Sequence, residues 1–422
     1  MDCADRAIGI TGIGIVSPIG IGKAACWESV EAGRSGVRRI SLFDPRGLPV
    51  QIAGEISDFD PKPFLYNRKA LKVMARDTQL GVAAAKLAWE DAGLRPGMVS
   101  PERVGVVLGA DRICNPVPES EAAYRNCMVD GRFDFSRWGT WGLQASYPLS
   151  FLRVLPNMIA SHISIAHDAR GPNNTIHQGE VSSLLALEEA VRVLQRGWAD
   201  VVLAGGASST MDPYDWVRHC TLGGLSQRQE DPAAACRPFD ADRDGQVRGE
   251  GAAILVLERV SQAVARGATI LGRILSIASA AEGYRPGQLA EGKALRRVIV
   301  QTLQEAELSP QALGHVNAHG LSTQEEDRLE AQILQDILPG IPVTAPKSFF
   351  GNLGAASGAV ELALSVLGLV RGVVPPTLNY QKPDPTCPVR VVHGGPWAST
   401  GPVLAITWNR SGQAAALLVS RE

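Results

Sequence analysis

Residues 236–258 read CRPFDADRDGQVRGEGAAILVLE. A loop rich in arginine, aspartate and glycine runs directly into an apolar stretch, and Ala252–Leu257 in that stretch predicts a buried strand. Runs of the same kind recur along the chain, at Ala7–Val16, Arg103–Leu108, Asp200–Ala204 and Val403–Thr407. The chain is therefore expected to form its core from several short, buried strands.

Helical patterns separate these strands. Each has apolar residues at three- and four-residue spacing, and the clearest are Asp77–Ala92, Val181–Arg196, Leu295–Ala306, Thr323–Leu334 and Gly358–Leu369. Strands that alternate with helices indicate an α/β architecture with largely parallel sheets. Two stretches, 110–150 and 211–243, interrupt the pattern. The first is rich in aromatic residues and is expected to pack on a surface or a partner.

The composition is that of an ordinary soluble protein. In 422 residues the charged fraction is 20% and the formal net charge is -2, so no large nonspecific attraction to nucleic acid or to anionic lipid is expected. The start, MDCADRAIGITG, lacks the features of a secretory signal, and the apolar stretch Val360–Val370 is short for a membrane span. These features predict a cytoplasmic protein. The seven cysteines are scattered without CxxC spacing, which disfavours a disulfide framework and a zinc site.

Two motifs suggest ligands that their details exclude. Gly12-Ile-Gly14 resembles the start of a dinucleotide fingerprint, but Ser17 stands at the third glycine and Pro18 follows where a helix should open. The stretch 240–245, DADRDG, resembles the opening of a calcium loop. Its closing carboxylate, Glu250, comes one residue early, and a strand pattern follows where a helix is required. Neither a nucleotide nor calcium is expected.

Four segments in order resemble the elongating β-ketoacyl synthases of fatty-acid and type II polyketide synthesis. They span nearly the whole chain. The first is GITGIGIVSPIGIG (9–22) with LFDPRGLPVQIAGEISDFDP (42–61), and the second is 236–258, where Gln246 replaces a usual apolar residue. The others are VNAHGLSTQEEDRLEAQIL (316–334), with Leu321 for a threonine, and PKSFFGNLGAASGAVE (346–361).

The resemblance implies a thiolase-like α/β fold. It has two similar layered halves, α-β-α-β-α, with mostly parallel inner sheets, here residues 1–258 and 259–422. It also implies a decarboxylative condensation in which a cysteine takes an acyl group from an acyl carrier protein. No cofactor is implied beyond the phosphopantetheine on which that carrier holds its substrates.

The segment GPNNTIHQGEVSSLLALEEA (171–190) resembles the family's nucleophile region, and the resemblance places Glu180 at the position of the cysteine. A carboxylate is stabilised at a helix N-terminus, so the fold would tolerate it there. As a nucleophile it would form a mixed anhydride, which is less stable than the parent thioester. Glu180 is either a helix-start acid with a structural role or a residue with a chemical one.

The remaining catalytic motifs are partly retained. The resemblance assigns His319 to the first catalytic histidine, and Lys347 with Glu361 to a lysine and glutamate that pair nearby. Asn352 stands at the second histidine. It could donate a hydrogen bond to an enolate oxygen but could not titrate. His319 is a catalytic residue or a relict of a tightly packed motif, and the Lys347–Glu361 pair is more typical of structure than of chemistry.

The C-terminal loop departs from the family pattern as well. Where a glycine-phenylalanine-glycine-glycine gate is expected, residues 409–413 read NRSGQ. Arg410, Ser411 and Gly412 are therefore candidate pocket residues, and Arg410 is predicted to form a salt bridge with Glu180. Of the other histidines, His177 is the candidate for the site, because it lies just before Glu180.

These residues leave three functions open. The first is a non-condensing subunit that resembles chain-length factors and acts with a cysteine-bearing ketosynthase and an acyl carrier protein. The second is a malonyl-carrier decarboxylase, against which the charge of Glu180 argues. The third is an atypical 3-oxoacyl-carrier-protein synthase, an acyltransferase. In each case the family resemblance implies a dimer, either a homodimer or a heterodimer.

Overall fold

The computed structural model describes residues 7–114, 116–283, 285 and 287–421. Within them the core is a twelve-stranded sheet in the order β15-β13-β12-β17-β18-β11-β1-β10-β9-β5-β8, with β2 paired to β1. Its strands are β1 (Ile8–Ser17), β2 (Gly20–Ile21), β5 (Val104–Ala110), β8 (Asn173–Ile176), β9 (Val201–Ser208), β10 (Gly251–Arg259), β11 (Gly272–Ala281), β12 (His315–Asn317), β13 (Pro342–Thr344), β15 (Arg390–Val391), β17 (Val403–Trp408) and β18 (Gln413–Ser420).

The sheet is mixed, which corrects the expectation of mostly parallel strands. Parallel pairs lie towards its two ends, in β9-β5-β8 and in β17-β12-β13-β15, whereas every ladder from β9 across β10, β1, β11 and β18 to β17 is antiparallel. One cause is local: a short turn joins β17 to β18, and a hairpin can only be antiparallel. A short ladder between β1 and β11 joins the two halves of the sheet.

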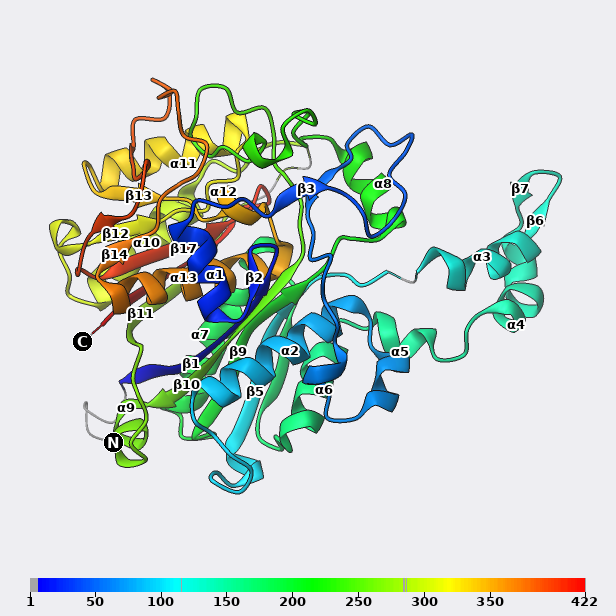
Figure 1. The fold of residues 1–422 in the computed structure, drawn as a ribbon, viewed down its shortest axis with the longest axis horizontal. Coiled ribbons are helices and arrows are strands. Elements are labelled where there is room, and N and C mark those ends of the chain that lie inside the picture. The colour runs from blue at the N-terminus through cyan, green and yellow to red at the C-terminus, as the bar shows by residue number, and fades with distance from the viewer. Residues whose placement is uncertain (1–6, 115, 284, 286, 422) are drawn as a thin grey trace.

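Helices cover the halves and fill the space between them (Figure 1). The outer face of the first half carries α2 (Arg76–Asp91) and α6 (Met158–His167), and that of the second carries α10 (Lys293–Glu305) and α11 (Gln324–Ile337). Between the halves lie α7 (Ser182–Gln195) and α13 (Ser357–Arg371), which contact strands of both. The layers follow the predicted order α-β-α-β-α. The division of the chain at residues 258 and 259 stays a prediction.

The central layer explains the most apolar segment of the chain. Gly354–Arg371 is long and apolar enough to cross a membrane by length and composition, and 89% of it is buried inside the molecule. A helix between two sheets has to be apolar on nearly all sides. Its hydropathy is that of a core helix.

The two glycines of the misleading fingerprint serve packing. β1 passes so close to α2 that a Cβ at Gly12 would lie 2.3 Å from the carbonyl oxygen of Ala88, and one at Gly14 would lie 1.9 Å from that of Ala84. Glycine is required wherever two backbones approach in this way. The segment is a buried strand and not a phosphate-binding loop.

The acidic loop after Asp240 is also occupied by the protein itself. The Asp240 carboxylate accepts backbone N–H groups of Gln381 and Lys382, both at 2.7 Å, and Asp244 accepts the Ser226 hydroxyl at 2.7 Å. Over the described residues no cluster of histidine, cysteine and acidic side chains could hold a metal. The six cysteines in this part of the chain are free, and Cys3 lies outside it.

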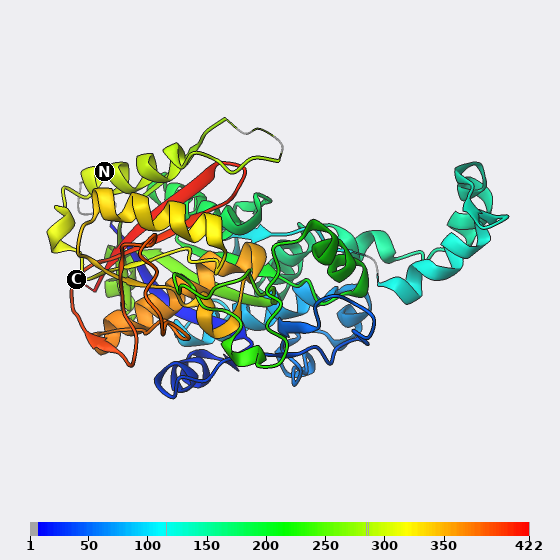
Figure 2. The same ribbon diagram turned by 90° about the horizontal axis from the view of Figure 1, so that it is seen from above.

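The first irregular stretch forms an arm, residues 116–149, that projects from the body in both views (Figures 1 and 2). It contains α3 (Val117–Asn126), the hairpin β6–β7 (Met128–Val129 and Arg132–Phe133) and α4 (Leu143–Ala145). The second contains α8 (Pro213–Leu222). The smaller elements are α1 (Lys23–Glu31), β3 (Val37–Arg39), β4 (Ile52–Gly54), α5 (Ser150–Val154), α9 (Val260–Ala265), α12 (Lys347–Phe350), β14 (Val373–Val374) and β16 (Trp397–Ala398).

Candidate active site

The predicted site residues converge from loops that follow strands of both halves. Glu180 lies in a single 3-10 turn (Gly179–Val181) between β8 and α7, and His319 follows β12. Lys347 opens α12, and Asn352 comes just after that helix. A cavity of about 570 Å³ is lined by residues of the loops at 177–180, 319–321 and 408–413, and by Arg218, Leu222, Gln246 and Glu326.

Glu180 is held by two donors on one carboxylate oxygen. Asn352 donates Nδ2–H to Oε1 at 3.2 Å, and Arg248 forms an ion pair with the same oxygen at 3.4 Å. The Glu180 side chain is 23% exposed and the Arg248 side chain only 7%. Glu180 lines the cavity and lies just before the first residue of α7. The positive end of the helix dipole therefore stabilises its negative charge.

Asn352 has no amide hydrogen left to offer. Its Oδ1 accepts the backbone N–H of Gly354 at 3.0 Å, which fixes the orientation of the amide because an N–H can only donate. The two hydrogens on Nδ2 are then accepted by Glu180 and, at 2.9 Å, by Gln246 Oε1. The donor expected to stabilise an enolate is therefore satisfied within the protein.

His319, Lys347 and Glu361 form a buried cluster beside the cavity. The Lys347 ammonium pairs with Glu361 Oε1 at 2.6 Å, as predicted, and also donates to the His319 carbonyl at 2.8 Å and to His319 Nδ1 at 3.2 Å. Since Nδ1 accepts, Nε2 carries the proton of the neutral ring. Burial, helped by the Lys347 charge, holds the pKa of His319 well below its usual range, and burial raises the pKa of Glu361 to about 7.

Two acids of α11 hold the histidine loop in place. Glu330 accepts the backbone N–H groups of His319 and Gly320 at 2.7 and 2.8 Å, and Asp327 accepts those of Leu321 and Ser322. Burial raises the pKa of Glu330 to about 8. The sequence signal was available, because both acids stand on the apolar-spaced face of the predicted helix 323–334.

The predicted salt bridge between Arg410 and Glu180 is wrong. Arg410 pairs instead with Glu326 and, at 3.0 Å, with Glu325, while Arg248 takes Glu180. The first turn of α11 is acidic and presents two carboxylates beside the loop. Arg410 and the neighbouring Ser411 do line the cavity, as expected. Gly412 is not among the lining residues and makes the turn, at φ 82°.

Two further residues complete the site. His177 lines the cavity, and its Nδ1–H donates to the carbonyl of Ala110, the last residue of β5, at 2.8 Å. Arg248 was not predicted. Its signal was a lone arginine between the loop 240–245 and the buried strand β10, a place where a charge needs a partner.

Comparison with known families identifies the family to which the chain belongs. Residues 5–263 match the family described as Beta-ketoacyl synthase, N-terminal domain, and residues 271–381 match Beta-ketoacyl synthase, C-terminal domain. The chain belongs to the β-ketoacyl synthase family. The ketosynthase alpha subunit of the tetracenomycin polyketide synthase of Streptomyces glaucescens is 35% identical over 91% of this chain and 89% of its own length.

Solved ketosynthase structures share the fold over nearly the whole chain. The ishigamide ketosynthase/chain length factor superposes with a TM-score of 0.86 at 27% identity, covering 99% of this chain and 100% of that one. A type II polyketide ketosynthase in complex with its acyl-carrier protein gives a TM-score of 0.83 at 28% identity, with coverage of 99% and 100%. The chain therefore has the thiolase-like ketosynthase fold of the fatty-acid and type II polyketide systems.

Proposed function

We propose that this ketosynthase homologue is a non-condensing, chain-length-factor-like subunit. It would act with a cysteine-bearing ketosynthase and an acyl carrier protein. The proposal rests mainly on position 180. The Glu180 carboxylate stands where the family has its cysteine nucleophile, and it is bound by Arg248 and Asn352. The likeness to the ishigamide ketosynthase/chain length factor supports the same role.

The same contacts argue against malonyl decarboxylation. An enolate needs donors aimed at its oxygen, and both hydrogens of Asn352 already have acceptors in Glu180 and Gln246. The Glu180 carboxylate would also repel the malonyl carboxylate. His319 keeps one N–H, which is half of the donor pair that the reaction would use.

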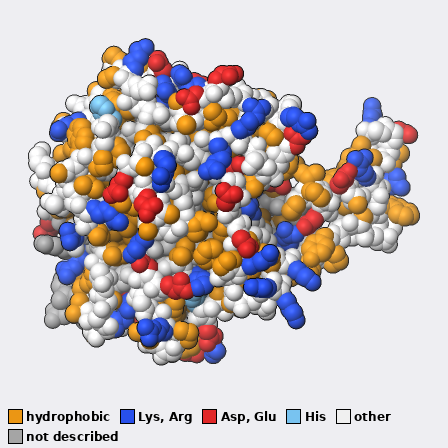
Figure 3. All heavy atoms as spheres, in the orientation of Figure 1, with side chains coloured by type: hydrophobic (Ala, Val, Ile, Leu, Met, Phe, Trp, Pro, Cys, Tyr) orange, Lys and Arg blue, Asp and Glu red, His pale blue; other side chains and the backbone are white. Residues whose placement is uncertain are grey.

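The arm is the surface that we assign to the ketosynthase partner. Large apolar side chains lie exposed along it, among them Phe135 at 77%, Leu143 at 58% and Trp141 at 51% (Figure 3). A cavity of about 780 Å³ lies at its root and is lined mostly by residues of the arm, and also by Tyr214 of α8. Large apolar side chains gathered on one projecting segment are typical of a protein interface.

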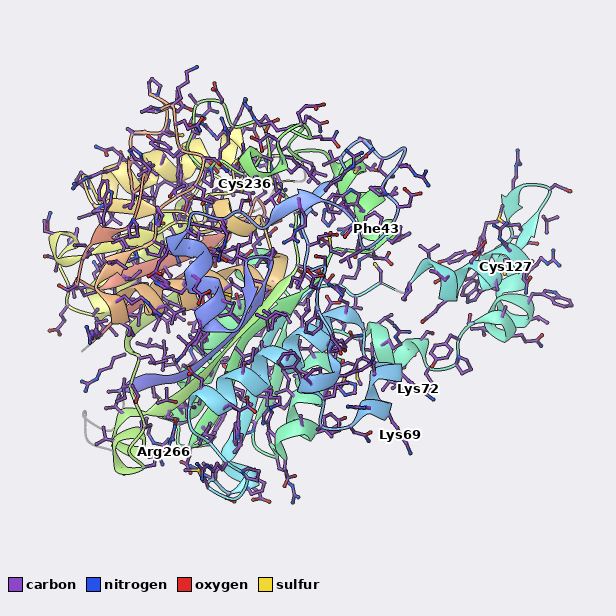
Figure 4. All side chains as sticks on the ribbon, viewed as in Figure 1. Phe43, Lys69, Lys72, Cys127, Cys236 and Arg266 are labelled. Carbon is purple, nitrogen blue, oxygen red and sulfur yellow. The ribbon has the colours of Figure 1, made fainter. Side chains whose placement is uncertain are left out.

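The carrier protein is expected to reach a basic surface near the root of the arm. Lys62, Arg68, Lys69 and Lys72 are all exposed on two short 3-10 helices (Lys62–Phe64 and Arg68–Val73), and Figure 4 shows Lys69 and Lys72 at the edge of the body on the side of the arm. Acyl chains would arrive on the carrier's phosphopantetheine, with no other cofactor. Charge reversal at Lys69 and Lys72 should weaken carrier binding most at low salt.

Coexpression tests the partner role. The chain would be produced with a tagged, cysteine-bearing type II ketosynthase, and the complex would be supplied with carrier protein and malonyl groups. The proposal predicts a one-to-one complex that makes full-length product, with activity lost when the cysteine of the ketosynthase is replaced. Product formation by this chain without that ketosynthase would contradict it.

A further inference from the structure

Arg248 is a buried charge with a single counter-ion. The residue is 6% exposed, and its Nε has no hydrogen-bond partner. Over the described part of the chain, Glu180 is the carboxylate within ion-pair distance of it. A buried guanidinium without an anion beside it is strongly unfavourable, so the stability of this corner depends on what stands at position 180.

The groups around Arg248 offer no other counter-ion in the part of the chain that the structure describes. The peptide of Arg248 is fixed on both sides, because the Gly54 N–H donates to its carbonyl at 2.9 Å and its backbone forms a bridge with Asn352. His219 cannot serve as a counter-ion, because burial and then the Arg248 charge lower its pKa to about 3. Because the Arg248 side chain is only 7% exposed, its guanidinium needs a counter-ion within the protein.

We propose that Arg248 is a positioning residue that requires an anion at position 180, so that Glu180 and Arg248 act as one unit. A cysteine placed at position 180 would therefore be held as its thiolate. The shorter side chain would put sulfur roughly 4–6 Å from the guanidinium, a range in which an opposite charge still favours the ionised form. The inference rests on the proposed function only in taking position 180 as the nucleophile position.

Alkylation of a cysteine at that position tests the pairing. Glu180→Cys and Glu180→Cys/Arg248→Met would be treated with iodoacetamide from pH 5 to 10, and the adduct would be followed by mass spectrometry of the peptide that contains residue 180. The thiolate is the reacting form. The midpoint of the rate profile should lie roughly 1–3 pH units lower with Arg248 present than without it.

A second arginine provides the control. Arg218 lines the same cavity but is half-exposed and lies near Asp215, so Glu180→Cys/Arg218→Met removes a positive charge without touching the Arg248 contact. It should keep the low midpoint, and Glu180→Cys/Arg248→Lys should keep most of it. Equal midpoints with and without Arg248, or an equal shift from Arg218→Met, would overturn the proposal.

If Glu180→Cys/Arg248→Met does not fold, thermal unfolding of variants without the cysteine tests the same pairing. Arg248→Met and Glu180→Gln should each lower the unfolding midpoint, and together they should lower it by less than the sum, because either one already breaks the pair. Strictly additive shifts would contradict the pairing. Neither experiment involves a ketosynthase partner, so a negative result would leave the partner role to be judged by coexpression.

Discussion

The ion pair between Lys347 and Glu361 is the residue-scale contact on which the buried side of the site depends. Both side chains are at most 2% exposed. The Lys347 ammonium lies 2.6 Å from Glu361 Oε1 and donates to the carbonyl and the Nδ1 of His319. Lys347→Met should lower the free energy of unfolding by about 3–5 kcal/mol, because it leaves a buried carboxyl without its partner. Urea denaturation at pH 7.5 measures the change.

A double variant separates the pair from the packing around it. Lys347→Met/Glu361→Leu removes both charges and should regain most of the loss. If the double variant is less stable than Lys347→Met alone, the cluster is held by packing and the ion pair is not its main support.

Glu330 should make the folding stability of the protein depend on pH. Its pKa is raised by burial to about 8 in the folded chain, so the folded state binds this proton more tightly than the unfolded state does. The contribution to stability is complete below about pH 4.5 and is lost as the pH rises towards 8. Urea unfolding at pH 5, 6.5 and 8 should show a steeper decline for the natural chain than for Glu330→Gln. Parallel declines would exclude Glu330 as the source.

The site shows what residue types can and cannot predict. The family resemblance implies the pairing of Lys347 with Glu361, and the structure confirms it. The resemblance does not imply the partner of Glu180: Arg410 and Arg248 are each plausible by charge, and only the course of the backbone brings Arg248 to it while α11 takes Arg410. Saturation of Asn352 by Gln246 likewise depends on side-chain orientation.

The strand β1 packs closely on the helix α2, and adding a single methyl group to β1 tests this packing. A Cβ at Gly14 would lie 1.9 Å from a carbonyl oxygen of α2, whereas one at Gly9 on the same strand meets nothing closer than 3.4 Å. Gly14→Ala should cost about 3 kcal/mol or more of unfolding free energy, and Gly9→Ala should cost little. Equal effects would show that the approach of strand and helix is not what limits position 14.

The local sequence pattern predicts many of the long elements and none of the shortest ones. The five predicted strands and five predicted helices are all present, each within a few residues of its expected bounds. The strands β12 and β13 are three residues long, too short for a periodic signal. The longer strands β11 and β18 are not among the predicted ones either; β18 is buried at nearly every position and so shows no alternation. The mixed order of the sheet depends on tertiary pairing that the local pattern does not encode.

At the scale of the whole molecule, the arm should decide whether a complex forms. Phe135→Ser/Trp141→Ser removes two exposed aromatic side chains, so it should reduce copurification with a ketosynthase at least tenfold, as the loss of interface anchors does. Trp198→Ser, which alters a residue 53% exposed on the body, is the matched control and should leave copurification unchanged. Equal recovery of both variants would place the interface elsewhere.

As a non-condensing subunit, this member of the family should neither take up an acyl group nor decarboxylate a malonyl group. Incubation of the purified chain with malonyl- and acyl-carrier protein, followed by intact-protein mass spectrometry, tests it most directly. We expect no mass increase on the chain and no acetyl-carrier protein, because Glu180 is a poor acyl acceptor and both amide hydrogens of Asn352 already have acceptors. An acyl adduct, or loss of carbon dioxide from the malonyl carrier, would contradict it.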